Sequence, residues 1–491
     1  MTSELSARAI DSMGWQFENT YARLPEYLFV RVQPAAVRAP EVVVVNHALA
    51  ESLGLDTRSL SAGDAAALFA GQSIPTGAEP LAQAYAGHQF GSFTMLGDGR
   101  AILLGEHRTP DGRLVDIQFK GSGQTPFSRR GDGLAALGPM LREYIISEAM
   151  YALGIPTTRS LAVVLTGEPV YRERVLRGAV LTRIAASHVR VGTFEYLAAQ
   201  RNIEGIRTLV AYVVKRLYPE LKEEENQSPA LLNAMADRQA ELIAQWQCVG
   251  FVHGVMNTDN MALSGETIDH GPCAFMDRYS PDTVFSSIDS MGRYAYGQQP
   301  RIAQWNLARF AETLLPILAP EGKDAIAIAQ EVIHEFPARF ELAWLTAMRQ
   351  KIGLATARPE DKDLINGLLD WMQRAEADFT NTFRGLLTGG GSAGEGDAAF
   401  ALWQQQWKDR LQAEGTSLND ARERMKSANP AVIPRNHKVE EALAAAERDN
   451  LGPMMALLEA LANPYEGGPH HDGFREPAPE SGEPYQTFCG T

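Results

Sequence analysis

Two short segments near the middle of the chain have residue types and spacing suited to holding a nucleotide with its metal ion. The first is His253-Gly-Val-Met-Asn-Thr-Asp-Asn260, and the second, Asp269-His-Gly271, follows it after a predicted hairpin. Protein kinases use H-R-D-x-x-x-x-N followed by D-F-G. Asn260 and Asp269 stand at the two metal-ligand positions of that pattern, and Mg²⁺ prefers such oxygen donors. The alternative is a buried histidine and two turn residues without a ligand.

The position of the catalytic aspartate in kinases is occupied here by Val255. Valine can neither accept a proton nor orient a hydroxyl, whereas an acid, Asp259, immediately precedes Asn260. The metal-ligand positions are therefore intact, whereas the usual base is displaced. Because a decayed kinase would be expected to lose its metal ligands as well, the pattern favours an enzyme over a catalytically dead scaffold.

Residues upstream are candidates for binding phosphates. Leu96-Gly-Asp-Gly-Arg100 is a glycine-rich turn between predicted strands, where glycine lets the backbone approach a phosphate closely; an ordinary hairpin turn is the alternative. Lys120 ends the next strand, where kinases place their phosphate-binding lysine. Such a lysine needs a carboxylate from the following helix. Glu143 and Glu148 are both candidates, and we favour Glu143.

A polar loop from Gly121 to Gly133 contains four glycines and two arginines. It could be a lid that contacts the nucleotide or contain only a plain Asp132-Gly133 turn. Arg183 and Arg190 follow further along the chain. If both converge with Lys120, they would hold a polyphosphate through bidentate contacts. Such a trap suits a pyrophosphate leaving group held away from the acceptor better than transfer of the terminal phosphate.

A strand-rich segment and a helical segment must position these residues. Alternation and turn residues predict strands at 93–96, 101–106, 114–120, 161–165 and 179–184, and a helix over 139–153 that ends at Gly154. A helix capped by Ser228-Pro229 leads into His253, and further helices are expected at 303–318, 323–335, 361–383 and 398–413.

These elements predict an α+β, protein-kinase-like fold with two lobes. We expect a strand-rich nucleotide-binding lobe over 1–195 and a helical lobe with the catalytic loop over 196–385. A linker, a helical extension and an irregular tail would occupy 386–491, with the linker at 387–396.

The composition excludes several classes of function. The chain of 491 residues has a formal net charge of -15, so general nucleic-acid binding is not expected. No apolar run of membrane-spanning length and no secretory signal are visible, which favours a cytoplasmic protein without membrane contact. The three cysteines, Cys248, Cys273 and Cys489, fit neither a zinc site nor a disulfide framework.

Five motifs together resemble the selenoprotein O (YdiU) family. They are Ala86-Gly-His-Gln-Phe-Gly91, Leu96-Gly-Asp-Gly-Arg100, Gln118-Phe-Lys-Gly-Ser-Gly123, Arg129-Arg-Gly-Asp-Gly133 and His253-Gly-Val-Met-Asn-Thr-Asp-Asn-Met261. The resemblance implies a kinase-like fold that binds ATP flipped relative to kinases and transfers AMP to Ser, Thr or Tyr hydroxyls of proteins. Two alternatives are a small-molecule phosphotransferase and a nucleotide-binding pseudokinase scaffold.

The resemblance also implies a role for individual residues. Asp259 would be catalytic, Glu143 would position Lys120, and Asn260 and Asp269 would bind Mg²⁺, with Mn²⁺ as an alternative. The implied ATP-binding residues are Gly97, Gly99, Arg100, Lys120, Asp132, Gly133, Arg183, Arg190 and Asp269. Some members carry selenocysteine near the C-terminus, where this chain has Cys489. That thiol could pair with Cys273 or remain free.

Overall fold

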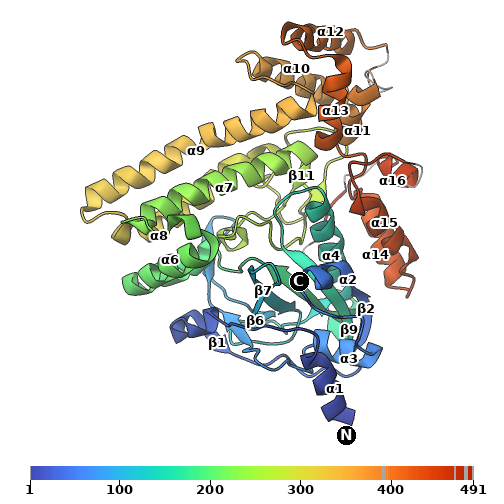
Figure 1. The fold of residues 1–491 in the computed structure, drawn as a ribbon. Helices are drawn as coiled ribbons and strands as arrows, with labels where there is room; N and C mark the ends of the chain where they lie inside the picture. Colours follow the sequence, from blue (N-terminus) through green and yellow to red (C-terminus); the bar gives the residue numbers. More distant parts are fainter. Residues whose placement is uncertain (1, 389–393, 395, 469–470, 480–484, 489–491) are drawn as a thin grey trace.

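The structure, a computed structural model, describes residues 2–388, 394, 396–468, 471–479 and 485–488. A β-rich lobe is followed by a helical lobe, and further helices extend from the helical lobe and return toward the sheet (Figure 1). This arrangement confirms the predicted α+β, kinase-like architecture. The three-part division of the chain at 195 and 385 remains a proposal.

In the described part of the chain the main sheet has eight strands, and all paired neighbours are antiparallel. Their order is β1 (Phe29–Arg31), β3 (Leu81–Gln83), β6 (Ala101–Arg108), β7 (Leu114–Lys120), β10 (Val175–Ala185), β9 (Arg159–Tyr171) and β2 (Glu41–Val45), with β8 (Ala135–Ala136) paired to β10. Lys120 lies opposite Ala101 on one side and Leu181 on the other. The lysine is thus held in the interior of the sheet.

Both faces of the sheet are covered, because alternate side chains of a strand point to opposite faces. Val163 and Leu165 of β9 join the core that contains α4 (Leu137–Ala152). Ala162 and Val164 join a second core with α2 (His47–Ser52) and α3 (Ala62–Phe69), next to α1 (Thr2–Asp11). Burial on both faces explains why these strands are continuous runs of apolar residues.

The helix α4 starts two residues earlier than expected and stops before Gly154, whose φ of 77° gives the left-handed turn that ends a helix. Eleven of its sixteen residues are buried, including Glu143. A polar residue in so apolar a setting requires a partner.

The helical lobe contains α5 (Val191–Ala199), α6 (Ile203–Leu217), α7 (Gln227–Val249), α8 (Gln299–Leu318) and α9 (Gly322–Lys351). The predicted cap at Ser228 is wrong: α7 begins at Gln227, because the side chain of Asn226 accepts a hydrogen bond from the Ser228 N–H. The helix expected over 323–335 continues to Lys351.

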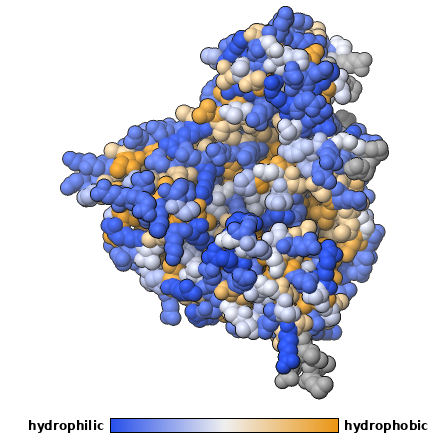
Figure 2. Space-filling view, in the orientation of Figure 1, coloured by the Kyte–Doolittle hydropathy of each residue, from blue (hydrophilic) through white to orange (hydrophobic). Residues whose placement is uncertain are grey.

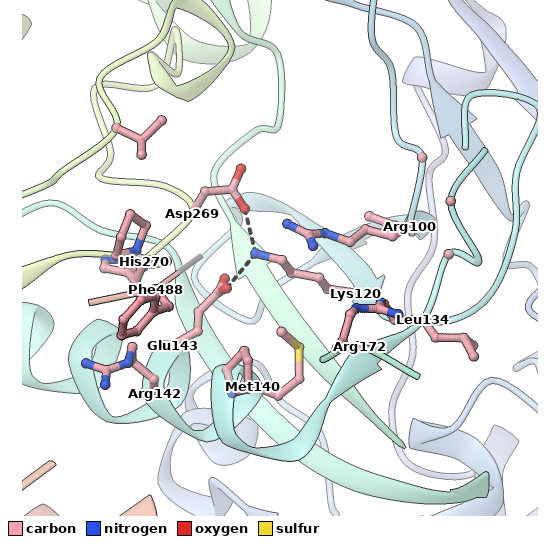
Figure 3. A pocket seen from close by; sticks show the side chains of 18 of the residues that line it. Arg100, Lys120, Leu134, Met140, Arg142, Glu143, Arg172, Asp269, His270 and Phe488 are labelled. Carbon is pink, nitrogen blue, oxygen red and sulfur yellow. Dashed lines mark hydrogen bonds and ion pairs between the residues drawn. The ribbon is translucent and has the colours of Figure 1, made fainter. Parts of the chain in front are cut away.

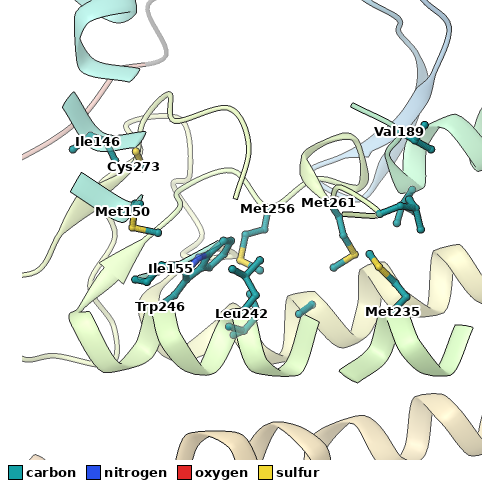
Figure 4. Packing of buried hydrophobic residues seen from close by; sticks show 14 of the residues in the cluster. Ile146, Met150, Ile155, Val189, Met235, Leu242, Trp246, Met256, Met261 and Cys273 are labelled. Atoms are coloured by element: carbon teal, nitrogen blue, oxygen red, sulfur yellow. The ribbon is translucent and has the colours of Figure 1, made fainter. Parts of the chain in front are cut away.

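The helix α7 packs against the catalytic loop. Its Trp246, Leu242 and Met235 belong to one core with Met256 and Met261 of the loop, and Figure 4 shows these side chains pointing toward one another. The strands β11 (Phe251–Val252) and β12 (Ala274–Phe275) pair and frame the loop at its two ends. A separate hairpin, β4 (Ala86–Gln89) with β5 (Ser92–Met95), packs against it.

The extension contains α10 (Asp361–Arg374), α11 (Phe379–Gly385), α12 (Ala398–Ala413), α13 (Leu418–Ala428), α14 (Asn436–Ala446), α15 (Gly452–Ala462) and the short α16 (Asp472–Arg475). The single helix expected over 361–383 is wrong. Glu376 has a φ of 50°, and Asp378 caps a new helix by accepting a hydrogen bond from Asn381 N–H. Most of the predicted linker at 387–396 lies outside the described residues.

Hydrophilic side chains cover most of the face in Figure 2, with smaller hydrophobic areas between them. In the part of the chain that the structure describes, no helix combines the length and the apolar character needed to cross a membrane.

The extension is seated on the helical lobe through a close approach that only glycine permits. Gly353, directly after α9, has a φ of 78°, and a Cβ there would lie 2.8 Å from Ala421 of α13. We predict that Gly353→Ala lowers the free energy of unfolding by roughly 3 kcal/mol, because it adds a clash to the strain of a left-handed alanine. Gly154→Ala, with a φ of 77° and open space around it, is the matched control and should lose only about 1 kcal/mol. Equal losses in denaturant unfolding would contradict this packing.

Candidate active site

A cavity of about 1100 Å³ is lined by residues of both lobes. Among the described residues, nine Arg and Lys and seven Asp and Glu line it, so its wall has a positive excess although the chain is acidic. All the predicted site residues line this one cavity: Gly97, Gly99, Arg100, Lys120, Asp132, Gly133, Glu143, Arg183, Arg190, Asp259, Asn260 and Asp269.

Lys120 is held between two carboxylates (Figure 3). Its Nζ donates to Glu143 Oε2 at 2.6 Å and to Asp269 Oδ1 at 2.7 Å. Glu148, the other candidate partner, instead accepts hydrogen bonds from Arg159 and Asn46 outside the cavity. The lysine therefore joins β7, α4 and the segment after the catalytic loop at one point.

The carboxylate of Asp269 also accepts hydrogen bonds from two arginines. Arg183 Nη2 donates to Oδ1 at 2.6 Å, and Arg190 Nη1 donates to Oδ2 at 3.0 Å. Burial alone would raise the pKa of Asp269, but Arg183, Lys120 and Arg190 together lower it well below its usual range. The backbone φ of Asp269 is 59°, an uncommon value outside glycine that places its carboxylate among the three cations.

His253 fixes the geometry between the two motif segments. Its Nε2 lies 2.9 Å from the carbonyl oxygen of Ile268, and its Nδ1 accepts from the Val255 N–H at 3.4 Å. Burial lowers the pKa of His253 despite these contacts, so the ring is neutral and donates from Nε2. The residue before Asp269 is thereby tied to the catalytic loop.

Asp259 is buried, and within the described residues its Oδ1 has no hydrogen-bond partner. Burial is the main reason that its pKa rises to about 6. A Cβ on Gly87 of the β4–β5 hairpin would lie 2.4 Å from that Oδ1, so only glycine leaves room for the carboxylate. A carboxylate with an open acceptor atom is suited to taking a proton.

The glycine-rich turn is covered by the polar loop that follows Lys120. Gly97 has a φ of 106°, and a Cβ there would lie 2.4 Å from the ring of Phe127. Thr125 Oγ1 donates to the Asp98 carbonyl at 2.6 Å, and Ser128 Oγ donates to the Gly99 carbonyl. The turn and the loop therefore form one connected wall of the cavity, and Arg100 points from it toward Lys120 (Figure 3).

Asp132 is bound by an arginine that the sequence did not single out. Arg172, directly after β9, donates from Nη1 and Nη2 to its two carboxylate oxygens at 2.7 and 3.1 Å, and this hydrogen bonding lowers the pKa of Asp132. Gly133, with a φ of 69°, lets the loop pass against Gly123, where a Cβ would lie 2.2 Å from its carbonyl carbon.

Other site residues were also missed by sequence reasoning. Asp98 is buried and accepts from Gln83 N–H at 3.1 Å, and the ring of Tyr85 lies 4.5 Å from the Arg190 guanidinium. No local pattern marks these residues, because their contacts come from distant strands. The glycine-rich motif containing Asp98 and the Ala86–Gly91 motif containing Gly87 gave the nearest signals.

The donor set fits a magnesium ion bound together with phosphates. Asn260 Nδ2 donates to the Val255 carbonyl at 2.9 Å, which leaves the amide oxygen as the group able to bind a metal. Among the described residues no three His, Cys, Asp or Glu side chains form a metal-binding cluster. Mg²⁺ needs few protein ligands, since phosphates and water complete its coordination, so Asn260 and Asp269 would suffice.

Cys273 is buried four residues after Asp269 in the sequence, and burial raises the pKa of its thiol to about 12. Cys489 lies outside the described residues. A pairing of the two remains a prediction.

Residues 11–462 match the family described as protein adenylyltransferase SelO. The chain is 60% identical to the protein nucleotidyltransferase YdiU of Geobacillus kaustophilus, over 97% of this chain and 99% of that protein. It is 57% identical to the protein of the same name from Syntrophotalea carbinolica, over 97% and 98%.

Among solved structures, the chain is similar to ROP2 from Toxoplasma gondii, described as a virulence factor with a protein-kinase fold and no enzymatic activity. The match has 10% identity and a TM-score of 0.24, over 69% of this chain and 84% of that one.

We predict that Glu143→Ala raises the Kd for ATP by at least about tenfold, because Lys120 loses its anchor on α4. Glu148→Ala on the same helix is the matched control, since its carboxylate faces away from the cavity; the Kd should stay within about twofold. Calorimetric titration of both variants measures this, and equal Kd values would contradict the assigned anchor.

Proposed function

The chain belongs to the SelO family of protein adenylyltransferases, and from this membership we propose that it transfers AMP from ATP to Ser, Thr or Tyr hydroxyls of proteins. The acceptor oxygen forms a bond to the α-phosphorus, the bond from that phosphorus to the bridging oxygen breaks, and pyrophosphate leaves. The observation that carries this proposal is the convergence of Lys120, Arg183 and Arg190 on one carboxylate.

These three cations supply the binding site for the leaving group. They lie on the strands that form the floor of the cavity and on the segment after β10, and each is at least nine-tenths buried. Charged hydrogen bonds in such a setting stabilise developing negative charge strongly. When a polyphosphate enters, its oxygens replace those of Asp269 as hydrogen-bond acceptors.

Asp269 and Asn260 are the residues that would hold a metal ion. A bound Mg²⁺ or Mn²⁺ would neutralise charge on the phosphates. Arg100, Gly97, Gly99, Asp132 and Gly133 form the wall against which the rest of the nucleotide binds.

Asp259 accepts the proton of the acceptor hydroxyl. Its pKa of about 6 keeps it ionised at neutral pH while making it more basic than an exposed aspartate. Val255 lies at the kinase position for this group, and no proton acceptor stands there. The displacement of the acid supports transfer at a different phosphorus from that used by kinases.

The first test is intact-protein mass spectrometry of the wild-type chain and Asp269→Ala after incubation with Mg²⁺ and ATP. We expect a gain of one adenylyl mass in the wild type and none in the variant, because loss of the charged metal ligand removes catalysis. A gain of one phosphoryl mass would make the chain a kinase. Modification that persists in Asp269→Ala would refute the assigned metal site.

Metal dependence gives a second test of the same site. EDTA should abolish transfer, and added Mg²⁺ or Mn²⁺ should restore it. Asn260→Ala should raise the Mg²⁺ concentration needed for half-maximal activity by at least about tenfold, because the ion loses one of its few protein ligands. An unchanged metal requirement would exclude Asn260 from the coordination shell.

A further inference from the structure

A second cluster of buried charges lies outside the cavity, where the sheet meets α6. Arg216 of α6 donates from Nη2 to Asp116 Oδ1 of β7 at 2.5 Å and from Nη1 to Glu106 of β6. Its side chain is 5% exposed, and those of the two acids are at most 1% exposed. Tyr212 OH donates to Glu106 Oε1 at 2.8 Å. None of these residues lines the cavity, and the proposed reaction does not use them.

The same cluster holds the short segment that connects Arg183 to Arg190. The carbonyl oxygen of Ala186 accepts from Arg216 Nη2 at 2.8 Å and from its Nε at 3.2 Å. The N–H of Ala186 donates to Glu266 Oε2 at 3.0 Å. One guanidinium thus binds a backbone carbonyl and two carboxylates from two different strands.

Asp116 also holds the backbone at His188, two residues after Ala186. Its Oδ2 accepts from the His188 N–H at 2.7 Å and lies 2.9 Å from His188 Nδ1. The next carbonyl, that of Val189, accepts from Leu263 N–H at 2.9 Å. The backbone between the two arginines is therefore fixed by side chains that Arg216 in turn orients.

The placement of both arginines also depends on this segment, because Arg183 lies three residues before Ala186 and Arg190 directly follows Val189. Within the described residues, Nε of Arg183 and Nε of Arg190 are buried without a hydrogen-bond partner. Their terminal nitrogens bind Asp269, and in addition Arg183 pairs with Glu143 at 2.8 Å and Arg190 donates to the Asp259 carbonyl at 2.9 Å. A polyphosphate would replace the oxygens of Asp269, so both guanidiniums would then be placed by these remaining contacts together with their backbone.

We infer that Arg216 is a positioning residue for the pyrophosphate-binding arginines: it sets the segment from Ala186 to Val189 so that Arg183 and Arg190 meet on one polyphosphate. The inference rests on the proposed function, since it assigns the two arginines to the leaving group. A displacement of about 1 Å in such a pair is enough to lower catalysis by orders of magnitude.

The test is calorimetric titration of inorganic pyrophosphate and of ATP, each with Mg²⁺, into the wild-type chain and Arg216→Met. The methionine variant keeps the volume of the aliphatic part of the arginine side chain and loses the guanidinium. Arg410→Met is the matched control, because Arg410 is also buried, binds two carboxylates, Asp361 and Glu414, and a backbone carbonyl, that of Thr356, and lies in the extension.

At a temperature at which the variant is folded, Arg216→Met should raise the Kd for pyrophosphate and the Kd for ATP by at least about tenfold. Arg410→Met should lower the thermal midpoint and leave both Kd values within about twofold. Arg216→Lys covers the case in which the methionine variant does not fold. A lysine can pair with one acid but cannot also bind Ala186, so its pyrophosphate affinity should fall by at least about threefold.

A folded Arg216 variant with a lowered thermal midpoint and wild-type affinity for pyrophosphate would overturn the inference and leave Arg216 a structural ion pair. A wild-type chain that binds neither ATP nor pyrophosphate would be a different outcome, because it overturns the proposed function itself and this inference with it.

Discussion

The arrangement of the site depends on which anion three buried cations bind, the carboxylate of Asp269 or a polyphosphate. Lys120, Arg183 and Arg190 come from β7, β10 and the segment after it, and all three donate to Asp269. Desolvated cations require anionic partners, so without a nucleotide the carboxylate of Asp269 keeps them together. Glu143 and His253 complete the junction from α4 and the catalytic loop.

The sequence was sufficient where a local pattern carried the information. The strand ending in Lys120, the helix carrying Glu143 and the spacing from His253 to Asn260 follow from periodicity and motif length. Reasoning failed where a tertiary contact decides. The partner of Asp132 is Arg172, forty residues away along the chain, and the break before Asp378 depends on a single cap that interrupts an otherwise helical pattern. The roles of the site residues remain predictions that need a bound nucleotide.

The distribution of charge separates the two tasks of the site. On one side, buried cations gather where, in the proposed reaction, negative charge would leave. On the other, Asp259 lies against Gly87 with a raised pKa, and its buried Oδ1 has no hydrogen-bond partner among the described residues. A kinase keeps its acid five residues before the metal-binding asparagine, at the position of Val255 here. In the proposed reaction the acid next to Asn260 serves an acceptor that attacks a different phosphorus. The Arg216 cluster contributes to the same separation, since it fixes the backbone that carries two of the cations.

The helix that carries Glu143 packs against α14 and α15, and Arg142 on that helix pairs with Glu440, 298 residues later in the chain. During synthesis, the strands and α4 leave the ribosome long before these helices exist. The nascent chain therefore carries an incomplete nucleotide site while most of it is already made. A chain that ends before α14 therefore lacks part of the cavity wall, because Glu440, Leu443 and Glu447 line it.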